Sequence, residues 1–144
     1  LKGAIDLGIA MQLTNIARDV CEDKKRNRQY IKPDFTSIQK TINEAEIFYE
    51  KSFKSISSIP LKSRFSVIVA RRVYKKIGDY IIKQKNTKNY NEAGKIYVPI
   101  FGKILQTFLA IFDFIKLLFV KELNYDNHVN HNILNEKVNI NERI

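Results

Sequence analysis

The stretch LKGAIDLGIAMQLTNIARDVCEDKK, residues 1–25, decides the fold class. Drawn as a helix, it carries apolar residues on nearly every side, and a helix that is apolar all round is typical of a buried one. These residues are Ile5, Leu7, Ile9, Met11, Leu13, Ile16 and Val20. We therefore expect residues 1–25 to form one buried helix of an all-α fold.

A polar stripe runs along one side of this predicted helix. Gln12, Asn15, Asp19 and Asp23 follow one another at intervals of three or four residues, so at about 100° per residue they share an arc of about 80°. Gly8 lies in the same arc, where its missing side chain leaves room for a ligand. Two carboxylates one turn apart repel each other unless a cation joins them. Two carboxylates and an amide suit Mg²⁺, which takes further ligands from water and phosphate oxygens.

The cations beside this stripe allow two interpretations of the acidic pair. In the functional interpretation, Arg18, Arg28 and nearby lysines neutralise a diphosphate that the metal holds. In the structural interpretation, Asp19 and Asp23 face solvent at the end of a helix and pair with Lys24 or Arg26. Spacing alone does not separate the two, because acids one turn apart are common on ordinary helices.

Composition limits the architecture. The chain has 144 residues, 44% apolar and 28% charged, which is typical of one globular domain. Its 5 Gly and 3 Pro are too few for the turns of an all-β sandwich. Cys21 is the one cysteine, which excludes an intrachain disulfide and a multi-cysteine zinc site and favours a cytosolic compartment. The chain starts with Leu and without a signal-like leader, so we expect a fragment that lacks its upstream part.

The net charge of +10 is unevenly distributed. Residues 122–144 hold four acids and two bases, so the residues before them carry the whole positive excess. Basic clusters stand at residues 24–28 and 71–76. The excess fits a diphosphate substrate, an anionic membrane surface or nucleic acid, and the lysine bias of an AT-rich genome explains it without any function.

Three more helices are expected downstream of a basic loop at residues 26–33. The first of them is capped by Thr36 or Ser37, and the next spans about residues 61–85. Residues 86–92 are polar and are expected to form a loop. The last helix spans about residues 100–123, and the Asn-rich residues 124–144 are expected to be disordered.

The last of these helices is strongly apolar from residue 108 to residue 120. A membrane span needs about 20 apolar residues with few charges, and Asp113 and Lys116 interrupt this run. We therefore expect the helix to lie on a bilayer surface or to pack in the core rather than to cross a membrane.

The string GIAMQLTNIARDVCED, residues 8–23, resembles the second aspartate-rich motif of the squalene/phytoene synthase family, in the form typical of bacterial phytoene synthases. The continuation RQYIKP, residues 28–33, resembles the basic loop that follows this motif, with the proline one place late. Residues 70–78 and 94–98 resemble later segments of the family. Similarity extends to about residue 105, and Lys95 stands where relatives usually have arginine.

The resemblance implies a C-terminal portion, of about four helices in residues 1–123, of the all-α isoprenoid synthase bundle. In that family two aspartate-rich motifs face each other across a central cavity and hold Mg²⁺, for which Mn²⁺ can substitute. The implied activity is the head-to-head condensation of two geranylgeranyl diphosphates to phytoene through a cyclopropyl diphosphate intermediate, a step of carotenoid biosynthesis. No second acidic motif occurs in this sequence, so the chain is expected to be inactive alone.

The resemblance also assigns roles to individual residues. The implied metal ligands are Asn15, Asp19 and Asp23. The implied diphosphate-binding residues are Gln12, Asn15, Arg18, Arg28, Tyr30 and Lys95. The implied catalytic residues are Asp19, Asp23, Arg18 and Tyr74. For Tyr74 the alternative is a tyrosine that packs in the helical core.

Two other functions stay open. One is a squalene-type synthase that uses farnesyl diphosphate, since chain-length choice depends on the depth of an apolar cavity. The other is a non-catalytic basic helical module that binds a membrane or nucleic acid, which explains the charge but not the polar stripe. For the synthase we expect a cytoplasmic protein, peripheral on the inner face of the plasma membrane, that binds geranylgeranyl diphosphate and no nucleic acid. Its oligomeric state is left open.

Overall fold

The computed structural model describes residues 2–120, and no strand occurs in that range. In chain order the elements are α1 (Lys2–Arg18), α2 (Val20–Lys25), α3 (Phe35–Ser55), the 3-10 turn η1 (Ile56–Ser58), α4 (Leu61–Ile82), α5 (Thr87–Ala93) and α6 (Ile100–Leu118). The all-α prediction is therefore confirmed. The predicted disordered segment, residues 124–144, lies outside the described residues.

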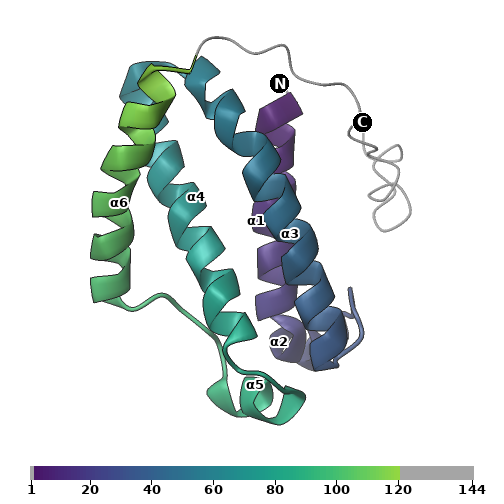
Figure 1. Cartoon of the computed structure of the whole chain (residues 1–144). Coiled ribbons are helices and arrows are strands. Elements are labelled where there is room, and N and C mark those ends of the chain that lie inside the picture. Colours follow the sequence, from purple (N-terminus) through teal and green to yellow (C-terminus); the bar gives the residue numbers. More distant parts are fainter. Residues whose placement is uncertain (1, 121–144) are drawn as a thin grey trace.

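The four long helices lie side by side, and α2 and α5 lie together at one end of them (Figure 1). α1 packs along α3, α4 packs against both, and α6 packs on α4. Three clusters of buried apolar side chains support these contacts. They are centred on Ile81 at the α2 and α5 end, on Tyr49 between α1 and α3, and on Ile68 between α4 and α6.

The first predicted helix differs from the structure in two ways. It is divided at Asp19 into α1 and α2, and it is not buried on all sides. Ala10 and Ala17 are fully buried, whereas Ile5 is 43% exposed and Gly8 and Gln12 face outward. The reason is that within residues 2–120 only α3 and α4 make extensive contact with α1, so one side of it stays uncovered.

The ends of the other helices also differ from the predictions. Asp34, not Thr36 or Ser37, caps α3, because one of its carboxylate oxygens accepts a hydrogen bond of 2.8 Å from the backbone N–H of Ser37. The predicted loop at residues 86–92 forms the helix α5, which Asn86 caps in the same way through the N–H of Asn89. α4 and α6 end at Ile82 and Leu118, three and five residues earlier than predicted.

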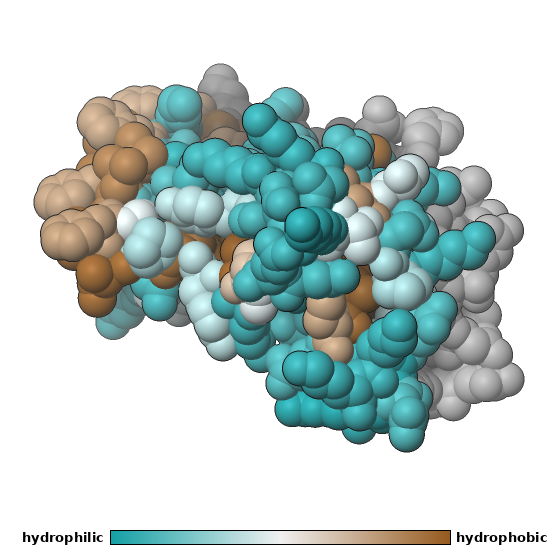
Figure 2. Space-filling view, turned by 90° about the horizontal axis from the view of Figure 1, so that it is seen from below, coloured by the Kyte–Doolittle hydropathy of each residue, from teal (hydrophilic) through white to brown (hydrophobic). Residues whose placement is uncertain are grey.

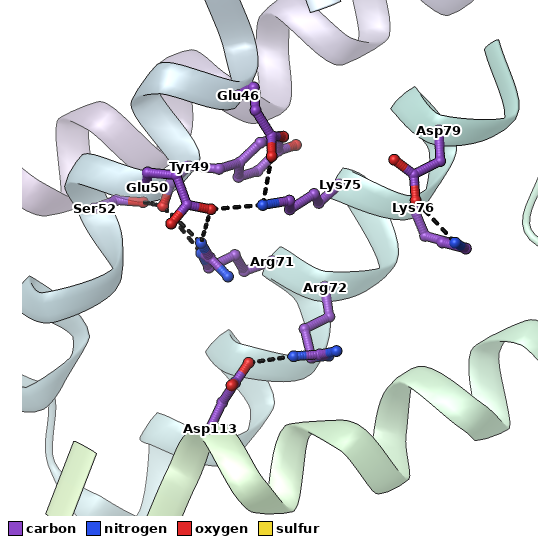
Figure 3. A network of polar contacts seen from close by, with 10 residues as sticks. All are labelled: Glu46, Tyr49, Glu50, Ser52, Arg71, Arg72, Lys75, Lys76, Asp79 and Asp113. Carbon is purple, nitrogen blue, oxygen red and sulfur yellow. Dashed lines mark hydrogen bonds and ion pairs between the residues drawn. The ribbon is translucent and has the colours of Figure 1, made fainter. Parts of the chain in front are cut away.

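The basic cluster of α4 is paired with carboxylates of the bundle's own helices (Figure 3). Each of its four cations pairs with a carboxylate on α3, α4 or α6. The pairs are Arg71 with Glu50, Arg72 with Asp113, Lys75 with Glu46 and Glu50, and Lys76 with Asp79. This cluster therefore holds three helices together, and its charges are already matched.

Arg71 is expected to contribute most to stability among these cations. Its guanidinium is buried, donates hydrogen bonds of 3.1 and 2.9 Å to the carbonyl oxygen of Tyr49, and lies 4.7 Å from the ring centre of Phe53. Arg71→Ala removes two buried, charged hydrogen bonds from that carbonyl and leaves it the hydroxyl of Ser52, so we expect it to lower the free energy of unfolding by about 2–3 kcal/mol. Urea denaturation measures the change, and Lys76→Ala, at a more exposed pair, should cost about 0.5 kcal/mol or less. Equal losses from both variants would contradict this role of Arg71.

Candidate functional site: the acidic bend between α1 and α2

The polar stripe of the sequence meets a bend in the helix at Asp19. This residue has φ −102° and ψ 13°, so α1 ends just before it and α2 starts just after it. Helix-type hydrogen bonds still bridge the bend, since the N–H of Asp19 donates to the carbonyl of Asn15 at 2.9 Å and that of Asp23 to the carbonyl of Asp19 at 2.8 Å. Asp19 and Asp23 therefore stay one turn apart along a continuous, bent chain.

A tyrosine from α5 lies at the same bend. The hydroxyl oxygen of Tyr90 is 2.8 Å from the carbonyl oxygen of Ala17 and 2.7 Å from that of Arg18, the last two carbonyls of α1. Tyr90 is 1% exposed, and its burial raises the pKa of the phenol, so the hydroxyl keeps its proton and acts as a donor. A residue 72 positions away in the chain thus binds the point where α1 ends.

Asp19 is held by two cations. Nε and Nη2 of Arg18 each donate a 2.8 Å hydrogen bond to one of its carboxylate oxygens, and Nζ of Lys95 lies 3.7 Å from Oδ1. Burial acts to raise the pKa of Asp19, but the hydrogen bonds and charge of Arg18, together with Lys95, outweigh it and hold that pKa below its usual value. Asp19 is therefore a carboxylate at neutral pH.

Glu22 extends this network towards the surface. Its carboxylate accepts hydrogen bonds of 2.9 Å from Lys95 and 2.8 Å from Arg26, and Lys95 and then Arg26 lower its pKa. The pKa of Lys95 is raised in turn, first by its hydrogen bond to Glu22 and then by the charge of Asp19. The structural interpretation paired Asp19 with Lys24 or Arg26, whereas in the structure Asp19 pairs with Arg18 and Lys95, and Arg26 pairs with Glu22.

Asn15 and Asp23 have no such partners. The side-chain carbonyl oxygen of Asn15 is buried and accepts no hydrogen bond within residues 2–120, and no ion pair of Asp23 occurs in that range. Asp23 lines a small hollow of about 10 Å³ together with Arg28 and Tyr30 of the following loop, which is room for about one water molecule. The loop thus places Arg28 and Tyr30, two predicted diphosphate-binding residues, beside Asp23.

The remaining predicted residues lie around this centre. Gln12 is exposed on the uncovered side of α1. Tyr74 of α4 is half-buried and packs between the two core clusters nearest to α1. The pKa of Arg18 is raised first by its hydrogen bond to Asp19, with smaller contributions from Tyr74 and Tyr97, so the phenol of Tyr74 lies in the electrostatic environment of the site.

The donor set fits part of a magnesium site. The carboxylates of Asp19 and Asp23 and the unpartnered carbonyl of Asn15 are hard oxygen donors of the kind that Mg²⁺ takes. Within residues 2–120 no group of three or more Asp, Glu, His or Cys side chains could hold a metal ion. The described residues therefore offer two carboxylates and an amide, and further ligands must come from water or from a phosphate-bearing molecule.

Sequence reasoning missed Tyr90 and Glu22. Glu22 lies outside the polar arc of a straight helix, and it joins the site through Lys95. Tyr90 lay in a segment that composition marks as a loop, although Asn86 before it is a good helix cap. That cap, followed by an apolar aromatic in a polar segment, is the signal that could have placed a short anchored helix there.

Comparison with known proteins finds similarity over the part of the chain that holds this site. The family model described as squalene/phytoene synthase matches residues 1–35, which include the whole stripe and the loop after it. A 15-cis-phytoene synthase of Paracoccus sp. is 32% identical over 96 residues, covering 54% of this chain and 32% of that protein. A 15-cis-phytoene synthase of Enterobacter agglomerans is 29% identical over 104 residues, covering 58% and 35%.

A plant protein gives a similar match. Phytoene synthase 1, chloroplastic, of Solanum lycopersicum is 33% identical over 99 residues, covering 54% of this chain and 24% of its own length. The chain thus spans about a third of the length of the curated relatives it matches, and no solved structure matches it. On the family match and these relatives, residues 1–35 of this chain are similar to the squalene/phytoene synthase family, and about half of the chain is similar to phytoene synthases.

Proposed function

We propose that this chain carries one of the metal–diphosphate sites of a prenyltransferase that joins two geranylgeranyl diphosphates head to head. The product would be phytoene, formed through a cyclopropyl diphosphate intermediate. Several similar proteins are named phytoene synthases, which supports this choice over the squalene-type reaction of farnesyl diphosphate. Because the chain spans a third of those proteins, we propose that it is inactive by itself.

One observation carries the proposal. The buried carbonyl oxygen of Asn15 has no hydrogen-bond partner within residues 2–120, and it lies one turn before a carboxylate that two cations surround. Burying a polar atom without a partner costs free energy. A bound cation next to Asp19 would satisfy the Asn15 oxygen, which the ion pairs of Asp19 within residues 2–120 do not.

Asn15, Asp19 and Asp23 would hold Mg²⁺ or Mn²⁺ in this scheme. When bound, the metal supplies positive charge that stabilises the diphosphate as it leaves the allylic carbon. Arg18 and Lys95 then serve the same leaving group, because both cations already lie beside Asp19 and can neutralise phosphate oxygens.

The remaining residues would bind and shield the substrate. Arg28 and Tyr30 line the hollow beside Asp23 and would donate hydrogen bonds to phosphate oxygens, and Gln12 would do so from the open side of α1. A Cβ on Gly8 would meet nothing within 4 Å, so this part of the helix leaves space for a prenyl chain. The half-buried Tyr74 would help to exclude water, which quenches carbocations.

Titration of the chain with inorganic pyrophosphate tests this proposal. We expect calorimetry to detect binding that requires Mg²⁺, and we expect Asp19→Asn with Asp23→Asn to weaken it at least about tenfold, since each ligand to a bound cation is a strong charge-assisted contact. Asp79→Asn is the matched control, because Asp79 pairs with Lys76 on the side of α4 that faces α6. If the double variant bound pyrophosphate as tightly as the unmodified chain, the basic residues alone would bind it, and the proposed metal site would be wrong.

A second property is favoured by the outer face of α6. None of the helices in residues 2–120 is long and apolar enough to cross a membrane, yet α6 exposes a continuous apolar surface, seen as the brown region at the left of Figure 2. This outer face consists of Ile100, Phe101, Ile104, Leu105, Phe108, Ile111, Phe112, Ile115 and Leu118. It is far more apolar than an ordinary soluble surface.

The charges of α6 favour an anionic bilayer as the occupant of this face. Lys103 and Lys116 are exposed, whereas Asp113, the one acid of the helix, is 8% exposed and turned inward to Arg72. An apolar helix face with exposed lysines and no exposed acid is suited to lie in the headgroup region of an anionic membrane. We propose peripheral membrane binding through α6, in keeping with prenyl substrates and products that partition into lipid.

A further inference from the structure

Residues 86–98 form a strap that folds back over α2 from the end of α4. Four contacts hold it in place. The Tyr90 hydroxyl donates to the carbonyls of Ala17 and Arg18, and Ile96 and Val98 pack in the core. Between them, the thiol of Cys21 contacts Oδ1 of Asn91 at 3.1 Å, and Lys95 donates to Glu22 at 2.9 Å. Tyr90 and Lys95 thus belong to the same segment, and both contact residues of the acidic bend.

The position of Lys95 depends on where the strap is anchored. Lys95 follows Tyr90 by five residues, and the turn between them passes through Gly94 at φ +64°, a conformation that favours glycine. Lys95 itself is well exposed and lies 3.7 Å from Asp19. A short tether from a buried anchor therefore decides whether its long, mobile side chain reaches the carboxylates.

We propose that Tyr90 is a positioning residue of the acidic site, an inference that rests on the proposed function. Its hydroxyl binds the last carbonyls of α1, holds the strap on α2, and thereby keeps Lys95 beside Asp19 and Glu22. Without the hydroxyl, the carbonyls of Ala17 and Arg18 lose their buried donor, the strap loosens, and Lys95 leaves the site. Tyr90 touches no reacting atom in this scheme and acts through Lys95.

A plain packing role is the competing explanation, and Tyr90→Phe separates the two because it keeps the ring and removes the oxygen. Cys21, the single cysteine of the chain, reports on the strap because its thiol contacts Asn91. We expect Tyr90→Phe to raise the rate of Cys21 alkylation by iodoacetamide about 3- to 10-fold, as the loss of one buried hydrogen bond predicts. The affinity for pyrophosphate with Mg²⁺ should fall by a similar factor.

Tyr49→Phe is the matched control. Tyr49 is as buried as Tyr90, but its hydroxyl contacts Thr14 at 3.0 Å in the middle of α1, away from the strap. It should lower the midpoint of thermal unfolding as much as Tyr90→Phe does and leave the alkylation rate unchanged. Equal alkylation rates in the two variants, or no change in Tyr90→Phe, would overturn the proposal.

The alkylation assay needs neither metal nor pyrophosphate, so it fails independently of the proposed function. Faster alkylation in Tyr90→Phe, in a chain that never binds pyrophosphate with Mg²⁺, would refute the proposed function and keep Tyr90 as the anchor of Lys95. Faster alkylation with unchanged pyrophosphate affinity would overturn the positioning role, since the contribution of Lys95 to the site would then not depend on the Tyr90 hydroxyl. Lys95→Ala in the Tyr90→Phe background should weaken pyrophosphate binding no further.

Discussion

Replacing Asp19 and Asp23 together by alanine should abolish phytoene formation by a complete synthase that contains this segment. A suitable enzyme is a chimera in which residues 1–105 replace the matching part of the Pantoea ananas 15-cis-phytoene synthase, which is 31% identical over 99 residues. We expect a loss of at least about 10³-fold in rate, because a metal that stabilises a leaving group contributes several kcal/mol and each 1.36 kcal/mol is worth about tenfold. Product analysis with geranylgeranyl diphosphate and Mg²⁺ measures it.

Two controls make this result specific. Asp79→Ala removes an acid that pairs with Lys76 away from the bend, and it should leave the rate within about twofold of the parent. Far-ultraviolet circular dichroism shows whether each protein keeps its helices. A well-folded parent chimera without activity would mean that the family resemblance of this segment describes ancestry only. An active double variant would show that Asp19 and Asp23 are not metal ligands.

Assaying the same chimera with farnesyl diphosphate tests which prenyl chain length, C15 or C20, the site accepts. Met11 and Ile16 lie on α1 next to the polar stripe and are half-buried, so they are placed to border the prenyl chain. A preference for the C15 substrate would favour the squalene-type alternative, while condensation of the C20 substrate supports the phytoene reaction. Either product would still depend on Asp19 and Asp23.

The sequence predicted the composition of the site better than its shape. The four-residue stripe follows from helical periodicity, which is a local property, and α1 and α2 keep that periodicity across the bend. At the bend, Tyr90 from 72 residues away donates to the carbonyls of Ala17 and Arg18. No pattern within residues 1–25 records such a contact, so a straight helix was the natural prediction and was wrong.

Charge patterning shows the same limit. Spacing indicated that cations surround the acids but could not select Arg18 and Lys95 from the basic residues nearby. Lys24 and Lys25, the nearest lysines in sequence, are exposed and make no ion pair within residues 2–120. Lys95 reaches the site only because the strap folds back, which is a tertiary property. The cluster at residues 71–76 suggested an anionic partner, and it proves to pair with carboxylates of the bundle.

The periodicity of α1 and of α6 was correctly read as helical, but burial was not predictable from it. An apolar side chain is buried only where another element covers it, and α3 and α4 cover one side of α1 while α4 covers one side of α6. Sequence identifies the sides that need a cover and does not say what supplies it. For α6 the periodicity identifies the apolar face, and it is the exposed Lys103 and Lys116 that favour an anionic bilayer as its occupant.

Exchange of three aromatic side chains on that face should abolish binding to anionic vesicles. Phe101 is 81% exposed and Phe108 and Phe112 are each 62% exposed, so their replacement by glutamine, a good helix former, leaves the bundle intact. Burial of an aromatic side chain is worth about 1.5–3 kcal/mol. Even partial insertion of three rings therefore predicts a loss of at least about 100-fold in partitioning, which co-flotation with vesicles of phosphatidylcholine and phosphatidylglycerol measures.

The matched control exchanges three exposed apolar residues outside α6. Ile47, Leu61 and Tyr97 are each more than half exposed, and their replacement by glutamine should leave flotation unchanged. Binding should also weaken in vesicles of phosphatidylcholine alone and at high salt, because Lys103 and Lys116 lose their anionic partners. Absence of flotation in the wild-type chain would overturn membrane binding. Light scattering tests a second occupant. If the wild-type chain is a dimer and the triple variant is a monomer, the outer face of α6 binds a second copy of the chain, because so continuous an apolar area requires a partner in water.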